Sequence, residues 1–208
     1  MKNSEAIRKL RATMRDIATH VIKVSDSLDE KQLEIMLNML IEARERKSRV
    51  MVIGAGRSGL VGKAFAMRLM HLGFIVYVIG ETITPSLKEG DVLIAISGSG
   101  QTQVVVTASH AAKKMGAKVI AITSYPDSPL ARISDHIVFI PGRTKIAKEL
   151  DYFARQILGI YEPLAPLGTQ FEDTTMIFFD GVIVALMNKL GISEKEMWQR
   201  HANVEIPS

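Results

Sequence analysis

Two short stretches rich in glycine and hydroxyl side chains limit the folds open to this chain more than any other feature. The first loop, residues 54–59, reads Gly-Ala-Gly-Arg-Ser-Gly, and the second loop, residues 97–102, reads Ser-Gly-Ser-Gly-Gln-Thr. Each follows an apolar run and precedes an amphipathic one. A buried strand that turns through glycine into a helix presents unpaired backbone N–H groups and the positive end of the helix dipole. Both loops therefore predict an anion-binding turn.

Apolar runs alternate with amphipathic stretches through the middle of the chain. Short apolar runs are typical of buried parallel strands, and the amphipathic stretches between them are typical of helices. Strands are predicted at residues 50–53, 74–79, 91–96, 118–122 and 137–140, and helices at residues 58–71 and 101–115. This alternation predicts an α/β fold with three layers, α/β/α, around a five-stranded parallel sheet.

The order of the strands decides whether the two loops meet. Right-handed crossovers and short connections favour the flavodoxin-like order 2-1-3-4-5. In that order the first and third strands are neighbours, and the crevice at their carboxyl ends is the topological switch point. Both loops are then expected to open into this one crevice.

The first 46 residues are predicted to form a helical hairpin ahead of the sheet. Apolar residues from Leu10 to Leu28 alternate spacings of three and four, the stripe of a helix that packs against another helix. Ser27 and Glu30 predict a capping box before a second amphipathic stretch. These helices are expected to pack on the core or on a neighbouring subunit, and residues 1–208 are interpreted as a single domain.

The last third of the chain predicts three further helices of different character. A helix is predicted at residues 146–158 and an irregular loop at residues 162–168. Residues 171–190 are apolar almost all round, which predicts a helix buried within the domain or between subunits. A short helix containing Trp198 is expected in the tail.

Composition narrows the class of ligand. The chain has no cysteine, and its five histidines lack paired metal-ligand spacing, so neither a disulfide nor a metal site is indicated. The net charge of +4 comes from lysines and arginines scattered among acids, which favours a small anionic ligand over nucleic acid. The polar amino terminus and the lack of an apolar stretch of about 18 residues predict a soluble, cytoplasmic protein without membrane contacts.

The first loop alone allows two other interpretations. It matches Gly-x-Gly-x-x-Gly, and Glu81 lies roughly where a dinucleotide fold places the acid that binds a ribose hydroxyl, although it follows the predicted end of its strand. Alternatively, the glycines serve only close packing of helix against strand. The second loop favours a single phosphate, because Ser97, Ser99 and Thr102 can each bond a phosphate oxygen.

The two loops resemble those of the sugar isomerase (SIS) domain family, which binds sugar phosphates. The resemblance rests on Gly-Arg-Ser-Gly after the first strand and Ser-Gly-Ser-Gly-x-Thr after the third. Four further segments resemble one branch of that family, the 6-phospho-3-hexuloisomerases, and they are residues 66–74, 80–85, 167–173 and 200–203. The likeness covers roughly residues 30–205, and the segment at residues 143–161 departs from it because it is longer than expected of compact members.

The resemblance implies an isomerase that moves the carbonyl of D-arabino-hex-3-ulose 6-phosphate from C3 to C2. The product would be D-fructose 6-phosphate, in the ribulose monophosphate pathway of formaldehyde metabolism. Such a reaction needs a general base and a donor for the enediolate oxygens, but no cofactor and no metal. Glu172 matches the catalytic glutamate of the family. The expected substrate-binding residues are Ser58, Ser97, Gly98, Ser99, Gly100, Gln101 and Thr102.

Three other residues near these motifs have more than one interpretation. His71 is expected to be the second catalytic residue, from its own or a neighbouring subunit, because histidine titrates near neutrality; alternatively, it only complements a helix dipole. His201 is a further candidate or a solvated tail residue. Arg57 could meet the phosphate but is interpreted as a surface charge.

Two rival functions remain open. Other SIS isomerases act on pentose or heptose phosphates, and a non-catalytic sugar-phosphate sensor would use the same loops for binding alone. The heptad-like first helix and the apolar stretch at residues 171–190 predict a homo-oligomer, a dimer or a tetramer, with sites near subunit boundaries.

Overall fold

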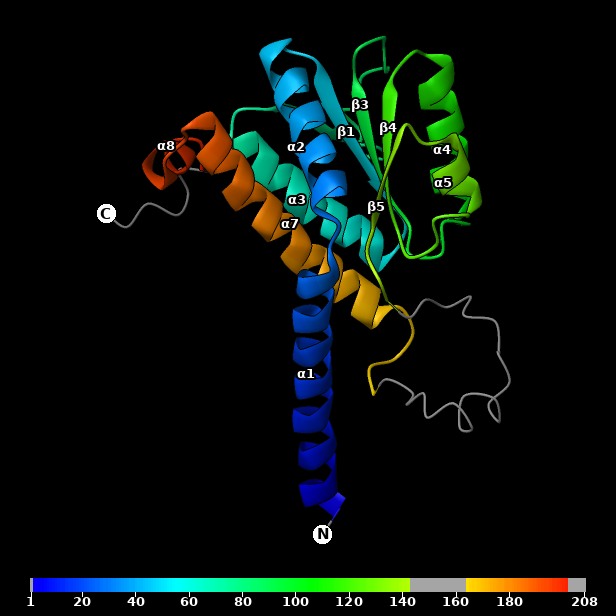
Figure 1. The fold of residues 1–208 in the computed structure, drawn as a ribbon, viewed down its shortest axis with the longest axis vertical. Helices are drawn as coiled ribbons and strands as arrows, with labels where there is room; N and C mark the ends of the chain where they lie inside the picture. Colours follow the sequence, from blue (N-terminus) through cyan, green and yellow to red (C-terminus); the bar gives the residue numbers. More distant parts are fainter. Residues whose placement is uncertain (1, 143–163, 202–208) are drawn as a thin grey trace.

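The structure, a computed structural model, describes residues 2–142 and 164–201. Its centre is a five-stranded, all-parallel sheet in the order β2-β1-β3-β4-β5 (Figure 1), which confirms the predicted topology. The strands are β1 (Arg49–Gly54), β2 (Ile75–Val78), β3 (Val92–Ile96), β4 (Lys118–Thr123) and β5 (His136–Phe139). Each lies within one residue of its predicted bounds. β3 is buried at all five positions, as expected for a strand with a neighbour on each side and helices on both faces.

Helices cover both faces of the sheet and complete three layers. They are α2 (Glu30–Glu45), α3 (Arg57–His71) and α7 (Thr169–Leu190) over one face, and α4 (Gln103–Lys114) and α5 (Pro129–Ile133) over the other. Successive strand residues point to opposite faces, so Val52 joins the core under α2, α3 and α7, whereas Ile53 joins the core under α4 and α5. The predicted α/β/α arrangement is confirmed.

The two amino-terminal helices follow one another end to end around Asp29 instead of folding back on each other (Figure 1), so the predicted helical hairpin is not formed. α1 (Lys2–Ser27) ends before Asp29, and the Asp29 side chain accepts a hydrogen bond from the backbone N–H of Gln32 at 2.8 Å, which caps α2. The predicted capping box of Ser27 and Glu30 is therefore wrong. Ser27 still belongs to the last turn of α1, where its hydroxyl donates to the carbonyl of Val24.

The first half of α1 extends away from the rest of the molecule (Figure 1). The helix contacts the domain from Asp16 onward, where the Asp16 carboxylate accepts hydrogen bonds from Leu164 and Gln170 and His20 donates to the carbonyl of Pro141. Before that point, Leu10 and Met14 of the predicted stripe are 54% and 64% exposed. The apolar face of this part of α1, called here the seam of α1, is therefore exposed to solvent.

α7 begins two residues earlier than predicted and packs along α3. The rings of Phe65 and Phe179 stack with their centroids 3.9 Å apart, and both side chains are buried. Gly191 ends the helix in the left-handed conformation, and α8 (Glu194–Trp198) follows behind a capping box. The helix predicted at residues 146–158 lies outside the described residues. None of the helices within residues 2–142 and 164–201 is long and apolar enough to cross a membrane.

Candidate active site

The first loop brings β1 and α3 into unusually close contact. A Cβ on Gly54 would lie 2.7 Å from the carbonyl group of Ser58, and one on Gly59 would lie 2.8 Å from the carbonyl oxygen of Gly54. Gly56 is the N-cap of α3 with φ of +58°, and it has no side chain with which to cap the helix. These glycines therefore serve close packing, and they also leave the first N–H groups of α3 without a side-chain cap.

The second loop is closed by its own hydroxyl groups. The Ser97 hydroxyl lies 2.9 Å from that of Thr102 and accepts a hydrogen bond from the backbone N–H of Gly100 at 3.1 Å. The Ser99 hydroxyl accepts from the N–H of Gln101. Ser97 is only 2% exposed. These hydroxyls hold the shape of the turn, and the side chain of Gln101 is exposed.

Both loops lie at the carboxyl edge of the sheet. Gly54 pairs in register with Ile96, so the two loops leave neighbouring strands at the same level. α3 then runs along one face of the sheet and α4 along the other, which makes this the topological switch point. Glu81, the acid considered for a dinucleotide, instead forms an exposed ion pair with Lys63 of α3.

Glu172 reaches the same edge from the first turn of α7. The start of α7 lies against the end of β5, where a Cβ on Gly142 would be 2.7 Å from the Cα of Phe171. Glu172 is buried, at 9% exposure, although it carries a carboxylate. One carboxylate oxygen, Oε1, lies 3.1 Å from where a Cβ on Gly168 would stand, so glycine at the N-cap of α7 leaves room for it.

Arg57 supplies the positive charge that this buried carboxylate needs. Its Nε lies 2.6 Å from Oε2 of Glu172, and its Nη2 lies 2.7 Å from Oδ1 of Asp173. A buried ionised carboxylate is costly unless a charge pairs with it, and the forked guanidinium does this with two nitrogens. The starts of α3 and α7 thus hold each other at the carboxyl edge through one arginine and two acids.

His71 lies far from Glu172 within the chain. It ends α3, which Arg57 begins, and at 1.5 Å per residue the two ends of this helix are about 21 Å apart. Burial, then the positive charges of His201 and Arg68, lower the pKa of His71 below its usual value. The structure therefore brings Glu172 together with the first loop, and it places His71 at the opposite end of α3.

His71 lines a pocket of about 510 Å³ between α3, α7 and α8. The ring of His71 lies 5.1 Å, centroid to centroid, from the ring of His201, which in turn faces Trp198. Arg200 donates a hydrogen bond to the His71 carbonyl. Asp180 and Glu194 line this pocket together with Arg68, so its lining carries groups of both charges.

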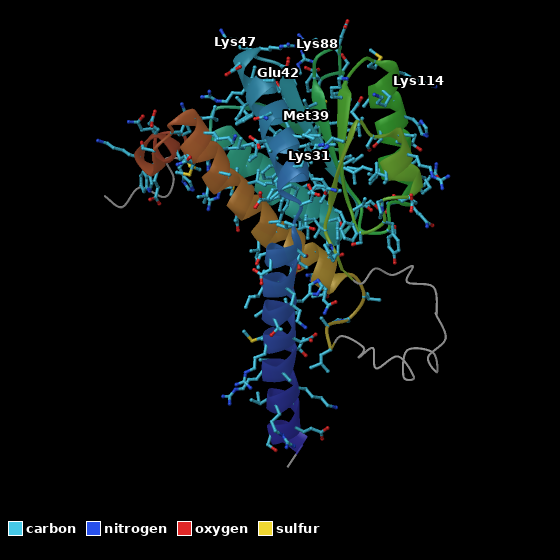
Figure 2. The ribbon with its side chains drawn as sticks, viewed as in Figure 1. Lys31, Met39, Glu42, Lys47, Lys88 and Lys114 are labelled. Carbon is cyan, nitrogen blue, oxygen red and sulfur yellow. The ribbon has the colours of Figure 1, made fainter. Side chains whose placement is uncertain are left out.

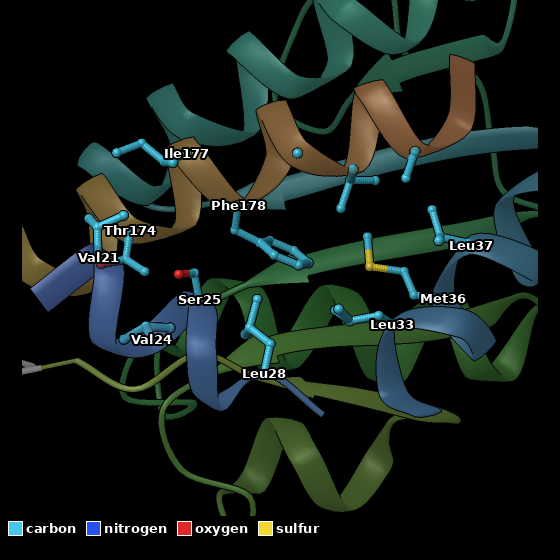
Figure 3. Close-up of a pocket in the computed structure, with 13 residues that line it drawn as sticks. Val21, Val24, Ser25, Leu28, Leu33, Met36, Leu37, Thr174, Ile177 and Phe178 are labelled. Carbon is cyan, nitrogen blue, oxygen red and sulfur yellow. The ribbon is translucent and has the colours of Figure 1, made fainter. Parts of the chain in front are cut away.

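A second pocket, of about 320 Å³, is apolar and lies between α1, α2 and α7 (Figure 3). Val24, Leu28, Met36 and Phe178 are among its lining residues. Thr174 also lines it, and its hydroxyl is buried without a hydrogen-bond partner in the part of the chain that the structure describes. None of the predicted site residues lines this pocket.

Lysine side chains gather at the opposite edge of the sheet from the loops. Lys47 lies in the turn before β1, Lys88 in the loop before β3 and Lys114 at the end of α4 (Figure 2), and all three are exposed. The carboxyl edge instead holds Arg57 between two carboxylates. Among the described residues, the two loops offer an anion their backbone N–H groups, their hydroxyls and this arginine.

Sequence reasoning missed two parts of the site. Arg57 was open to two interpretations because its acidic partners lie far along the chain, and its only local signal is its place beside Ser58 in the first loop. Gly168 is part of a predicted irregular loop, and nothing in that loop indicates that its missing side chain accommodates Glu172.

Comparisons with known proteins agree with this architecture. The family profile of the SIS domain matches residues 44–157. An uncharacterized protein of Aeropyrum pernix is 58% identical over 99% of this chain and 97% of its own length. The 3-hexulose-6-phosphate isomerase of Bacillus subtilis is 41% identical over 76% of this chain and 80% of its own length.

A solved structure extends the likeness to three dimensions. A Methanococcus jannaschii protein, whose crystal structure led to an inferred function of 3-hexulose-6-phosphate isomerase, is 34% identical. It superposes with a TM-score of 0.71 over 95% of this chain and 99% of its own.

Proposed function

This chain belongs to the SIS domain family, and we propose that it is the isomerase that interconverts D-arabino-hex-3-ulose 6-phosphate and D-fructose 6-phosphate. The relatives support a sugar-phosphate isomerase at the level of class. The observation that carries the specific proposal is the buried carboxylate of Glu172 at the same sheet edge as two phosphate-type loops. A sensor of sugar phosphates would need the loops but not a buried base.

The two loops hold the phosphate in this proposal. The uncapped N–H groups at the start of α3 and those of the second loop offer donors to phosphate oxygens at the positive ends of two helices. Ser58, Ser97, Ser99 and Thr102 add hydroxyls, which exchange their bonds within the loop for bonds to phosphate. Phosphate contacts of this kind fix the position of the substrate without taking part in the chemistry.

Glu172 then moves one proton between neighbouring carbons. Its carboxylate takes the proton from C2, the C–H electrons form the C2–C3 double bond, and the C3 carbonyl becomes an oxyanion. The O2 proton then passes to the O3 oxyanion, and return of the abstracted proton to C3 places the carbonyl at C2. Atoms and charge balance without an added redox partner, and Arg57 beside Glu172 stabilises the oxyanion.

A second copy of the chain completes the site in this proposal. His71 lies at the far end of α3 from Glu172, so it serves the reaction only if another subunit brings its α3 end to this site. The exposed seam of α1, with Leu10 and Met14, and the neighbouring apolar pocket support association of copies. His71 would then donate a proton to a substrate oxygen.

A coupled assay tests the function. Purified protein is mixed with D-arabino-hex-3-ulose 6-phosphate, and D-fructose 6-phosphate is followed through phosphoglucose isomerase and glucose-6-phosphate dehydrogenase. We expect turnover with the hexulose to exceed that with pentose and heptose phosphates by a wide margin. Tight binding of the sugar phosphate without any conversion would identify a sensor instead, and faster turnover of a pentose or heptose phosphate would identify another SIS isomerase.

A further inference from the structure

One guanidinium group bridges two consecutive acids of α7. Consecutive helical residues point about 100° apart around the axis, so their carboxylates reach Arg57 from two sides. Glu172 receives Nε at 2.6 Å and Asp173 receives Nη2 at 2.7 Å. The side chains of these acids differ in exposure, at 11% for Glu172 and 36% for Asp173.

The pair of Arg57 and Glu172 conflicts with the work of a general base. Oε2, the oxygen that Arg57 occupies, is the one directed toward the first loop, while Oε1 packs against Gly168. When Oε2 accepts a proton from a substrate carbon, the carboxylate loses its negative charge, and the attraction between Glu172 and Arg57 weakens. If Glu172 is the base, the ion pair weakens in this way each time the carboxylate becomes neutral, and Arg57 is then free to turn to another acceptor.

Arg57 would leave the site if Glu172 were its only partner. Its side chain is 57% exposed, and a long charged side chain gains rotamer entropy and hydration when it is released into water. Asp173 is the second contact that holds it. Nη2 remains bound to Asp173 while Nε turns from Glu172 to a negatively charged oxygen of the substrate.

We propose that Asp173 is a positioning residue that tethers Arg57 at the site while Arg57 exchanges Glu172 for the substrate oxyanion. This inference rests on the proposed isomerase function. The two neighbouring acids then have separate tasks: Glu172 transfers the proton, and Asp173 holds the guanidinium of Arg57.

The kinetic test compares Asp173→Asn, Arg57→Lys and the double variant. Asp173→Asn is expected to lower kcat about tenfold, the loss of roughly one charge-assisted contact, with KM changed less than about twofold. Because Asp173 acts only through Arg57, the double variant should be no slower than Arg57→Lys. Losses that multiply in the double variant, or a change confined to KM, would overturn the tether.

Matched variants separate this role from a general loss of charge or fold. Glu34→Gln removes another acid that pairs with α7, through Lys189 at 3.5 Å on the surface, and it should leave kcat and KM unchanged. Asp173→Glu keeps the carboxylate and should recover part of the activity. Thermal melting of every variant shows whether a lost rate reflects unfolding, and Asp173→Asn is expected to melt close to the wild type.

A binding measurement keeps the inference testable apart from turnover. In ¹⁵N-arginine-labelled protein, the Nε–H signal of Arg57 is assigned by its loss in Arg57→Lys and followed while D-fructose 6-phosphate is added. In the wild type it should shift and remain sharp, whereas in Asp173→Asn it should broaden through exchange with solvent. If the wild type binds but does not isomerise, the proposed function fails while this comparison stands. Equal signals in the two proteins would refute the tether.

Discussion

At the scale of single residues, Glu172 shows how a charge is kept inside a folded site. Burial alone would penalise the carboxylate, and the pair with Arg57 offsets that penalty. The sequence predicts Glu172 from the motif that it shares with the family, but it offers no local pattern for the ion pair, because Arg57 lies far along the chain from both acids, 116 residues from Asp173. Only the packing of α3 against α7 brings them together.

Replacing Glu172 tests the base directly. Glu172→Gln is expected to lower kcat about 10²–10⁴-fold, the contribution typical of a general base, while the sugar phosphate still binds because the loops are intact. Initial rates from the coupled assay and calorimetric titration with D-fructose 6-phosphate measure the two effects separately. Turnover near the wild-type rate would remove Glu172 from this role.

His71 predicts how stability depends on pH. Burial and the neighbouring positive charges lower its pKa in the folded chain, so the unfolded chain binds its proton more readily. Stability from this source is complete above the unfolded pKa of about 6.5 and is lost as pH falls through the folded value.

We therefore expect the melting temperature of the wild type, measured by differential scanning calorimetry, to fall as the pH is lowered from 7.5 to 5.5. His71→Asn should reduce this slope. Substitution of His110, an exposed residue of α4, should leave it as it is. An unchanged slope in His71→Asn would assign the pH dependence to other groups.

At the scale of elements, α3 and α7 form the frame of the site. α3 begins with Arg57 and ends with His71, and α7 carries Glu172 in its first turn. Phe65 and Phe179 hold the two helices together between these ends. Any change that separates the helices would open the ion pair as well.

Phe179→Ala tests this frame. Removal of a fully buried phenylalanine typically costs about 3–5 kcal/mol of unfolding free energy, and here it also removes the stacked partner of Phe65. Chemical denaturation should show a loss in this range, with kcat reduced in the protein that remains folded. Phe139→Ala, at a 38% exposed position of β5, is the matched control and should cost much less.

The sheet could be predicted from the sequence, whereas the ends of some helices could not. Hydrophobic periodicity and glycine punctuation placed every strand, because buried parallel strands are nearly continuous apolar runs. The cap of α2 was predicted at Ser27, because Ser and Asp both cap helices and the chain contains each near the junction. Gly168 caps α7 for a reason that lies in Glu172, outside any local pattern.

At the scale of the whole molecule, the distance between His71 and Glu172 within one chain leads to a prediction about assembly. Subunit association, which we propose from the exposed apolar residues of α1, is not encoded in any one motif, since an apolar stripe serves equally well within a chain or between chains. The proposal that each site uses Glu172 of one copy and His71 of another has a direct test.

Mixed oligomers provide this test. Glu172→Gln and His71→Asn are each expected to be nearly inactive alone, whereas dissociating and reassembling a 1:1 mixture should restore activity at about a quarter of the sites of a dimer. If the mixture is no more active than either variant alone, the proposal of a site shared between two copies is wrong. Light scattering during size-exclusion chromatography checks that oligomers have formed.

If copies associate through the projecting half of α1, as proposed, the survival of the protein depends on its concentration. A lone helix of about 15 residues is only marginally stable in water, so we expect these residues to unwind when the copies separate. Trypsin cuts unwound chain after basic residues, and this half carries Arg8, Lys9, Arg11 and Arg15. Dilution would then turn a reversible dissociation into covalent, irreversible trimming, and the scarcest pools of protein would be shortened first.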